Sequence, residues 1–285
     1  MTLEEKCITG HLHPITLMID RICAIMTDIG FDVADGPELE TEFYNFDALN
    51  VPKDHPSRDM QDTFFVHADK DADTAFGLPK KRGDKVLLRT HTSPVQIRTM
   101  EAWAKGGYKN DMLAIIVPGK AYRNEATDAT HEAQFHQVEG LLIGKDISLA
   151  HLKGVLKHLF TELFGKEIDV RLRASFFPFT EPSAEIDMQC FKCDGHGSKP
   201  PALPDGSPDL SRAGLGCSLC KNTGWIEIMG SGMVHPNVLE NCGVDSTKYQ
   251  GFAFGGGIDR LAMLKWGIDD IRLLYSGDLR VVNQF

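Results

Sequence analysis

Apolar side chains recur at helical spacing in two stretches of the chain. The first stretch stops at Gly30 and the second lies between Ser148 and Gly165, so each predicts an amphipathic helix. The apolar positions are Ile15, Met18, Ile19, Ile22, Met26 and Ile29 in the first, and Leu152, Val155, Leu156, Leu159, Phe160 and Leu163 in the second.

A third helix is predicted by its boundary residues. Ser93 is a good N-cap and Pro94 suits the first helical turn, so a helix is expected over residues 95–104, ended by the glycines at 106–107. The last helix is expected to begin after Gly257.

Between these helices the chain reads as strands joined by turns. Strands are predicted at a short run opened by Leu87 and Leu88 and at residues 113–117, 134–143, 169–177, 185–189 and 225–229. Residues 31–85 are rich in Asp, Pro and His and predict long connections. Clustered strands with short turns favour an α+β fold, an antiparallel sheet flanked by helices, over a βαβ repeat. One domain is expected over residues 1–285, with an insertion at 190–224.

The composition is that of a globular protein with room for one large core. Of its 285 residues, 42% are hydrophobic and 25% are charged. No apolar run reaches the roughly 18 residues of a membrane span and no signal peptide is evident, so a cytoplasmic location is expected. A net charge of −10 argues against broad neutralisation of nucleic-acid phosphates, so RNA contacts should be local or come from a partner. The basic run at 79–82 is interpreted as a solvated loop.

A polar hairpin is the first candidate for chemistry. Arg123 and Glu125 end one apolar run, and a second run follows after a short loop. Strand alternation in the second run sends Phe135, Gln137 and Glu139 to one face. An aromatic ring, an amide and a carboxylate on one face are unusual for a core, and the plain alternative is a half-exposed sheet face.

Two further groups of residues complement this hairpin. Arg89, His91 and Ser93 share one parity, so the two polar clusters could converge on one pocket. The glycines at 255–257 let the backbone approach a ligand, and Arg260 follows in the first turn of a helix, where the dipole favours anions. Two arginines from separate segments can hold the two ends of a triphosphate, although a tight turn into a packed helix is the plainer reading of the glycine run.

The cysteines form a second, independent motif. Two C-x2-C pairs, Cys190 with Cys193 and Cys217 with Cys220, flank a 23-residue spacer with four prolines and five glycines. Four thiolates at this spacing suit tetrahedral Zn²⁺, and disulfides are not expected in a reducing cytosol. The turn-rich halves resemble the zinc half-sites of J-domain chaperones, and an empty or degraded knuckle is the alternative. Cys7, Cys23 and Cys242 are interpreted as structural or free.

Several strings in a fixed order carry a family resemblance. They are residues 45–50, 55–58, 89–93, the hairpin at 119–140, 176–183, 232–238 and 251–255. With them the chain, from about His13 to Phe285, resembles the α subunits of bacterial phenylalanyl-tRNA synthetases, which are class II aminoacyl-tRNA synthetases. The resemblance implies the class II catalytic domain and ATP-dependent activation of L-phenylalanine to phenylalanyl-adenylate. It also implies transfer to tRNA(Phe) and assembly with a β subunit in an (αβ)₂ heterotetramer.

The resemblance assigns roles at the ATP site. Arg123 contacts the α-phosphate and the carboxylate of phenylalanine, while Arg260 holds the far end of the triphosphate; both serve as catalytic residues. The remaining ATP-binding residues are Glu125, His131, Phe135, whose ring stacks on adenine, and, as a weaker assignment, Glu227. Mg²⁺ bridges the phosphates.

The resemblance also assigns an amino-acid pocket and a second metal. Phe177 and Phe179, taken to share strand parity, sandwich the substrate ring. The other phenylalanine-binding residues are His91, Ser93, Gln137 and Glu139 around the ammonium group, with Ala253 and Phe254 at the end of the pocket. Glu181 belongs to a magnesium site shared with the partner subunit.

One departure from the family is large. Its α subunits begin with a helical coiled-coil arm that grips tRNA, and this chain starts almost at the catalytic domain, so weak tRNA binding with retained adenylate formation is expected. The alternative function is a catalytically idle, synthetase-like regulatory or scaffold protein with a zinc-ribbon interaction module. Such a protein is expected to lose Arg123, Arg260 or the phenylalanine pair, and all are present.

Overall fold

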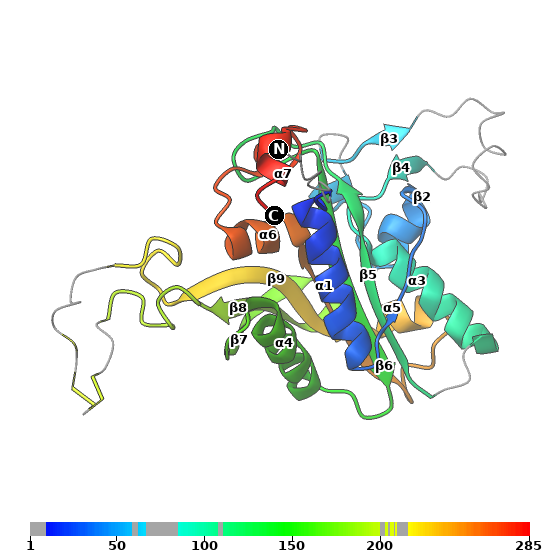
Figure 1. The fold of residues 1–285 in the computed structure, drawn as a ribbon. Coiled ribbons are helices and arrows are strands. Elements are labelled where there is room, and N and C mark those ends of the chain that lie inside the picture. The colour runs from blue at the N-terminus through cyan, green and yellow to red at the C-terminus, as the bar shows by residue number, and fades with distance from the viewer. Residues whose placement is uncertain are drawn as a thin grey trace, which may run out of the picture.

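A seven-stranded sheet forms the centre of the molecule, in the order β1-β5-β6-β10-β9-β8-β7 (Figure 1). The computed structural model describes residues 10–58, 62–66, 85–107, 111–199, 203–204, 206–207, 209 and 216–285, and the basic run at 79–82 lies outside them. The strands are β1 (Asp32–Val33), β5 (Leu113–Tyr122), β6 (Gln134–Gly144), β7 (Val170–Phe177), β8 (Thr180–Gln189), β9 (Trp225–Val234) and β10 (Gln250–Gly257). Only β1 and β5 pair in parallel within this sheet; all other neighbours in it are antiparallel.

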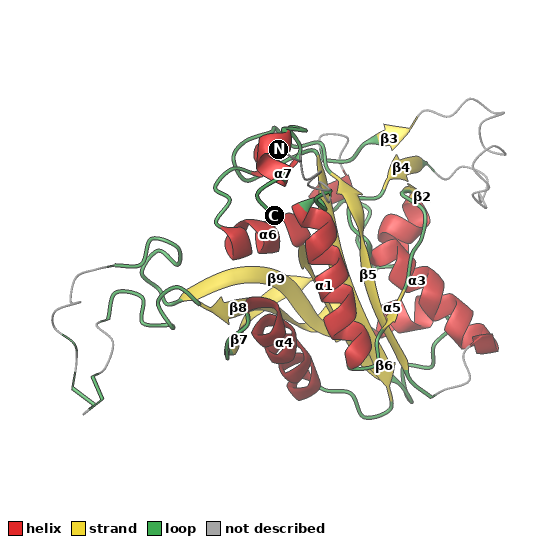
Figure 2. Ribbon diagram, viewed as in Figure 1, coloured by secondary structure: helices red, strands yellow, loops and turns green. Residues whose placement is uncertain are grey.

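Helices cover both faces of the sheet (Figure 2). They are α1 (Pro14–Asp28), α3 (Ser93–Ala102), α4 (Leu149–Phe164), α5 (Pro236–Asn241), α6 (Ile258–Trp266) and α7 (Leu279–Val282). Short helical turns lie at η1 (Phe43–Asp47), η2 (Pro56–Arg58), η3 (Trp103–Gly107) and η5 (Ile271–Leu274), and a small sheet joins β2 (Leu39–Thr41), β4 (Val86–Leu88) and β3 (Phe65–Val66). Among the described residues, no helix is long and apolar enough to cross a membrane.

Two hydrophobic cores result, because strand side chains alternate between the faces. Val138 and Phe252 point toward α1, α4 and α6, where they belong to the first core. Leu141, three residues beyond Val138, packs with α3 and α5 in the second core. The side chains of β6 that share the parity of Leu141 therefore line the α3 side of the sheet, and these include the predicted polar positions.

The predicted amphipathic helices are confirmed. α1 ends at Asp28, next to the predicted stop, and α4 is capped by Ser148 and by Gly165 in the left-handed conformation (φ 72°). The antiparallel sheet flanked by helices is also confirmed, with the parallel edge strand β1 as an addition.

Several details of the prediction were wrong. The third helix begins at Ser93, not after it, and Thr92 is its N-cap residue. Residues 31–85 are not connections alone, because they contain short strands and the turn η1. The helix after Gly257 is followed by α7, so it is not the last.

The largest miss is β10, a central strand between β6 and β9. It pairs with β6 from Gln250 opposite Gly144 to Gly257 opposite Gln137. Its four glycines carry no periodic apolar signal, and glycine has low strand propensity. The glycine run at 255–257, for which a tight turn into the helix is the plainer alternative, is the end of this strand.

Candidate active site

Two adjoining cavities lie around the ends of β6, β9 and β10, the smaller on the α3 side of the sheet and the larger against α6. The larger cavity has a volume of about 800 Å³ and the second, which we term the aromatic cavity, about 600 Å³. The residues common to both walls are Arg123, Glu125, Gln137, Gly230 and Gly255. Because Arg123 lies on the common wall, its guanidinium can contact molecules bound in both cavities.

Phe177 and Phe179 form the apolar wall of the aromatic cavity. Their rings are stacked, with centroids 5.8 Å apart and planes 9° from parallel. Phe179 lies in the turn between β7 and β8, so the shared strand parity expected for the two rings is not the reason that they meet. Asn50, itself in the left-handed conformation (φ 59°), donates a hydrogen bond of 2.7 Å to the Pro178 carbonyl and so fixes this turn.

The opposite end of the aromatic cavity is acidic. The Glu139 carboxylate is 6% exposed and accepts hydrogen bonds from the Thr92 backbone N–H (3.1 Å) and the Ser93 hydroxyl (2.5 Å). Burial raises the pKa of Glu139, and the hydrogen bonds from Ser93 and Thr92 oppose that rise. The Ser93 hydroxyl is thus committed to Glu139 and does not cap α3, which corrects the N-cap prediction.

Two further polar atoms in this cavity are buried without a partner. Nδ1 of His91 and Oε1 of Gln137 have no hydrogen-bond partner within the described part of the chain. Burial, followed by the charge of Arg123, lowers the pKa of His91 from 6.5 to about 3, while a hydrogen bond to the Asn45 backbone opposes the shift. The ring is therefore neutral near pH 7, and its Nδ1 can accept a hydrogen bond.

The loop that carries His91 is fixed by a buried amide. The Asn45 side chain donates to the Thr90 hydroxyl (3.0 Å) and accepts from the Thr90 backbone N–H (3.1 Å). These two hydrogen bonds give a structural role to Asn45, the first residue of the segment 45–50 that carries part of the family resemblance. They also hold the Thr90 carbonyl, which accepts from Nε of Arg123 at 3.3 Å.

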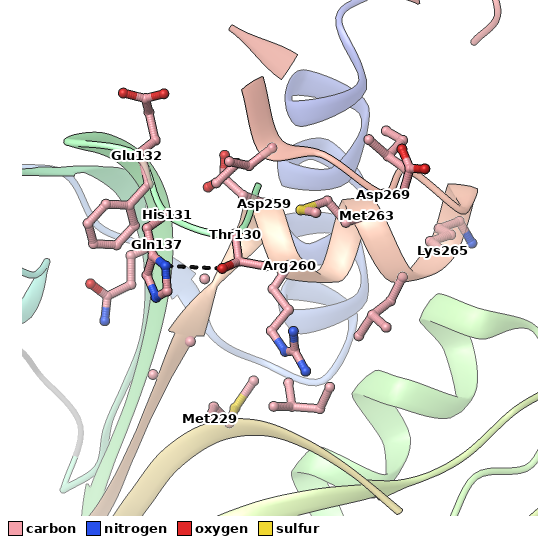
Figure 3. Close-up of a pocket in the computed structure, with 18 of the residues that line it drawn as sticks. Thr130, His131, Glu132, Gln137, Met229, Asp259, Arg260, Met263, Lys265 and Asp269 are labelled. Carbon is pink, nitrogen blue, oxygen red and sulfur yellow. Dashed lines mark hydrogen bonds between the residues drawn. The ribbon is translucent and has the colours of Figure 1, made fainter. Parts of the chain in front are cut away.

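Arginines from two elements face the larger cavity. The Arg123 guanidinium lies 5.0 Å from the centroid of the Phe135 ring. Figure 3 shows Gln137 and His131 on the side of β6 and Arg260 reaching toward Met229 from α6. Nε of Arg260 donates to the Glu227 carbonyl (3.2 Å), which anchors one edge of the guanidinium of this cavity-lining residue.

A buried acid holds α6 against β6. Asp259 is 3% exposed and accepts from the His136 backbone N–H (2.7 Å) and from the Tyr275 hydroxyl (2.5 Å). The Tyr275 hydroxyl also lies 3.0 Å from Nδ1 of His136. Because Asp259 precedes Arg260 directly, this network sets where the arginine enters the cavity.

The four-cysteine cluster lies where β8 ends and β9 begins. The Sγ atoms of Cys190 and Cys217 are 3.8 Å apart, those of Cys193 and Cys220 are 3.7 Å apart, and all four lie within 4.8 Å of one another. The backbone N–H groups of Gly197 and Gly224 donate to two of these sulfurs at 3.3 Å. A Cβ on Gly224 would meet the Gly195 carbonyl oxygen at 2.1 Å, so the two halves pack in a way that requires glycine there.

Comparison with known proteins identifies the architecture that holds these cavities. A family model described as the class II core domain of tRNA synthetases matches residues 1–285. The chain belongs to this family. A phenylalanine–tRNA ligase alpha subunit from Bacillus licheniformis is 50% identical over 278 residues, covering 97% of this chain and 69% of that protein. The Ligilactobacillus salivarius protein of the same name is 51% identical over 277 residues, and that of Bacillus subtilis 48% over 277, with the same coverage.

Within the class II core, most of the predicted site residues are brought together. The larger cavity contains Arg123, Glu125, His131, Phe135 and Arg260, and the aromatic cavity contains His91, Ser93, Gln137, Glu139, Phe177, Phe179 and Ala253. Phe254 also borders the aromatic cavity, but its ring stacks on Phe252 in the first core.

Three other polar residues line neither of these cavities. Arg89 is buried with its guanidinium on the carbonyls of Lys120, Gly36 and Pro37, so it does not converge with His91 and Ser93. The Glu227 carboxylate pairs with Arg173 at 2.5 Å. Glu181 is exposed on β8. The ATP role of Glu227 and the magnesium role of Glu181 stay predictions.

Sequence reasoning missed the residues that support the site. Asn45, Asn50 and Thr92 had no assigned role, although all three lie in strings that carry the family resemblance, 45–50 and 89–93. Asp259 and Tyr275 were also missed. Asp259 directly precedes Arg260 in the sequence, and this position could have indicated a role for it. Tyr275 is distant from the other site residues in the sequence, and only the fold brings its hydroxyl to Asp259.

Proposed function

We propose that this chain is the catalytic α subunit of a phenylalanine–tRNA ligase, which activates L-phenylalanine with ATP and transfers it to tRNA(Phe). The observation that carries the proposal is the wall shared by the two cavities, with Arg123 in it. One cavity suits an aromatic amino acid and the other suits a nucleotide. The names of the relatives, at about half identity over nearly the whole chain, support the same reaction.

The aromatic cavity suits phenylalanine at both ends. The stacked rings of Phe177 and Phe179 offer faces and edges to a substrate ring. At the polar end, the Glu139 carboxylate, Nδ1 of His91 and Oε1 of Gln137 are acceptors, and two of them lack a partner in the described residues. An ammonium group donates three hydrogen bonds and satisfies all three acceptors, which offsets the cost of their burial.

The larger cavity suits ATP. Phe135 offers a ring face for the adenine, and Arg260 stands across the cavity to receive the outer phosphates. ATP enters as its magnesium complex, in which phosphate oxygens and water hold much of the ion's coordination. Glu181, exposed on β8, is the residue that we assign to a magnesium ion shared with the partner subunit.

The reaction needs positioning and fixed charge. A carboxylate oxygen of phenylalanine attacks the α-phosphorus, the bond to the bridging oxygen of the β-phosphate breaks, and pyrophosphate leaves. Negative charge accumulates at the α-phosphate, where the Arg123 guanidinium stabilises it and also orients the attacking carboxylate. Since Arg123 lies on the common wall, one side chain can do both. Transfer from the adenylate to the terminal adenosine of tRNA(Phe) follows.

A zinc ion fits the four-cysteine cluster. Sulfurs about 2.3 Å from a central ion lie about 3.8 Å apart in a regular tetrahedron. Two Sγ pairs, at 3.8 and 3.7 Å, match this edge, and all four sulfurs lie within 4.8 Å of one another. We assign the ion a structural role, because the four ligands leave no open coordination position for a reactant.

The partners follow from the same assignment. We propose assembly with a β subunit as an (αβ)₂ heterotetramer in the cytoplasm, where thiolates stay reduced and available to zinc. Phe176, 76% exposed at the mouth of the aromatic cavity, leaves an apolar surface that a partner subunit can cover.

The test is pyrophosphate exchange by the chain co-expressed with its β subunit. We expect exchange that depends on L-phenylalanine and ATP, followed by charging of tRNA(Phe). A complex that assembles and binds neither substrate would support the idle scaffold, and exchange with another amino acid would reject the assigned specificity.

A further inference from the structure

The cysteine hairpin contributes to the wall of the nucleotide cavity. Phe191, Lys192 and Leu219 line the larger cavity together with α6. Lys192 and Leu219 occupy the same position in the two C-x2-C halves, directly before the second cysteine. The reaction described above gives these residues no role.

This part of the hairpin is fixed to the body of the protein. Cys190, Cys217 and Cys220 are buried members of the first hydrophobic core. The Phe191 ring stacks on Phe164 at the end of α4, with centroids 4.8 Å apart. The Lys166 ammonium donates to the Phe191 carbonyl and to the Asp194 carboxylate. The cysteine ligands therefore pack into the first hydrophobic core, and the residues between them form part of the cavity wall.

Lys192 brings a free positive charge to this wall. Its side chain is exposed, and the described residues provide it with no hydrogen bond or ion pair. Lys265, which also lines the cavity, differs because its ammonium donates to the Leu163 carbonyl. Of these two lysines, Lys192 is therefore the one whose ammonium group makes no hydrogen bond or ion pair with the described residues.

The hairpin lies beside the arginine assigned to the outer phosphates. Gly224, which donates to the Cys220 sulfur, is followed after three residues by Glu227, whose carbonyl accepts from Arg260. Three residues of strand span about 10 Å, a length comparable to an extended triphosphate. Because Lys192 and Arg260 also line the same cavity, both can contact one bound anion.

We propose that the four-cysteine hairpin forms one wall of the ATP site and that Lys192 binds the outer phosphates of ATP. This inference rests on the proposed function. The metal acts here only by holding the backbone of residues 190–193, which sets the position of Lys192. Phenylalanine binding is independent of this wall, because none of its residues lines the aromatic cavity.

The test compares two lysine variants in the assembled αβ complex. Lys192→Gln removes the charge in the wall, and Lys199→Gln removes an exposed charge of the same hairpin that does not line the cavity. Equilibrium dialysis measures Kd for ATP, for phenylalanine and for a non-hydrolysable phenylalanyl-adenylate analogue, which lacks the outer phosphates. Zinc content is measured in each protein.

We expect Lys192→Gln to raise Kd for ATP about tenfold, the effect of one charge-assisted hydrogen bond. Kd for phenylalanine and for the analogue should not change, zinc content should stay equal, and Lys199→Gln should match the parent. Removal of the metal should also weaken ATP more than phenylalanine. An unchanged Kd for ATP, or equal losses for ATP and the analogue, would overturn the inference. Failure of the proposed function would look different, because the parent complex itself would not bind the analogue.

Discussion

Replacing Glu139 with Gln keeps the shape of the side chain and removes its charge. The Gln carbonyl oxygen can accept from the Thr92 N–H, and its amide can donate to the Ser93 hydroxyl, which rotates to accept. Both hydrogen bonds of the native carboxylate are then kept, so the variant should fold with at least the stability of the parent. Any loss of function therefore reports on the charge.

The size of the loss follows from the contact that the charge makes. A buried hydrogen bond between a carboxylate and an ammonium contributes about 1.5–3 kcal/mol, so phenylalanine should bind about 10- to 150-fold more weakly to Glu139→Gln. The parent should also lose kcat/KM for phenylalanine as pH falls, because the ionised carboxylate is the binding form. Burial raises the pKa of Glu139, so this acid limb lies at higher pH than for an exposed glutamate.

Pyrophosphate exchange over a range of pH measures both effects. In Glu139→Gln the acid limb assigned to this residue should disappear. In the control Ser93→Ala, loss of a donor that stabilises the charged form should raise the pKa further and move the limb to higher pH. A KM for phenylalanine within about twofold of the parent, or an equal rise in the KM for ATP, would refute the reasoning.

Three other changes test the rest of the site. Arg123→Ala should slow adenylate formation about 10²- to 10³-fold with a smaller loss of ATP affinity, measured by single-turnover kinetics, and equal losses would reject its role at the α-phosphate. Metal analysis of chelator-free preparations should find one zinc per chain, and well under one equivalent would contradict the four-cysteine site. Ala253→Gly should admit para-chlorophenylalanine with little loss for phenylalanine, because we assign Ala253, which lines the aromatic cavity, to the end that meets the para position of the substrate ring. Pyrophosphate exchange with the chlorinated substrate that matches the parent would place Ala253 elsewhere.

The fold was predictable where one physical signal dominated. α1 and α4 each bury a stripe of apolar side chains, and that stripe is visible in the sequence. β8 and β9 run further than predicted, because their extra pairs, such as Ser183 opposite Gly232, bring small or polar residues together. Such pairs form through backbone hydrogen bonds within the sheet, and these leave no periodic pattern in the side chains.

The candidate site was predictable in its residues and less so in its geometry. Alternation on β6 put Gln137 and Glu139 on one face, and both line the aromatic cavity. The same parity argument failed for Arg89, because its segment leaves the strand after Leu88 and turns into α3. Residues two apart share a face only while the backbone stays extended. The sequence does not show clearly at which residue the strand ends, so it does not show where this rule stops applying.

Two glycines explain why β10 and the second half of β9 were hard to recognise. A Cβ on Gly255 would lie 2.6 Å from Cγ of Glu139, and one on Gly230 would lie 2.9 Å from the Phe177 ring. Each glycine gives the space of its missing side chain to a neighbour that lines the aromatic cavity. A glycine inside a strand destabilises the fold by about 0.5–1 kcal/mol relative to alanine. In return, the missing side chains leave room for Glu139 and Phe177 to line the cavity. β10 and the second half of β9 therefore lack the regular alternation of bulky side chains by which a strand is recognised, whereas the first half of β9 keeps it in Ile226 and Ile228.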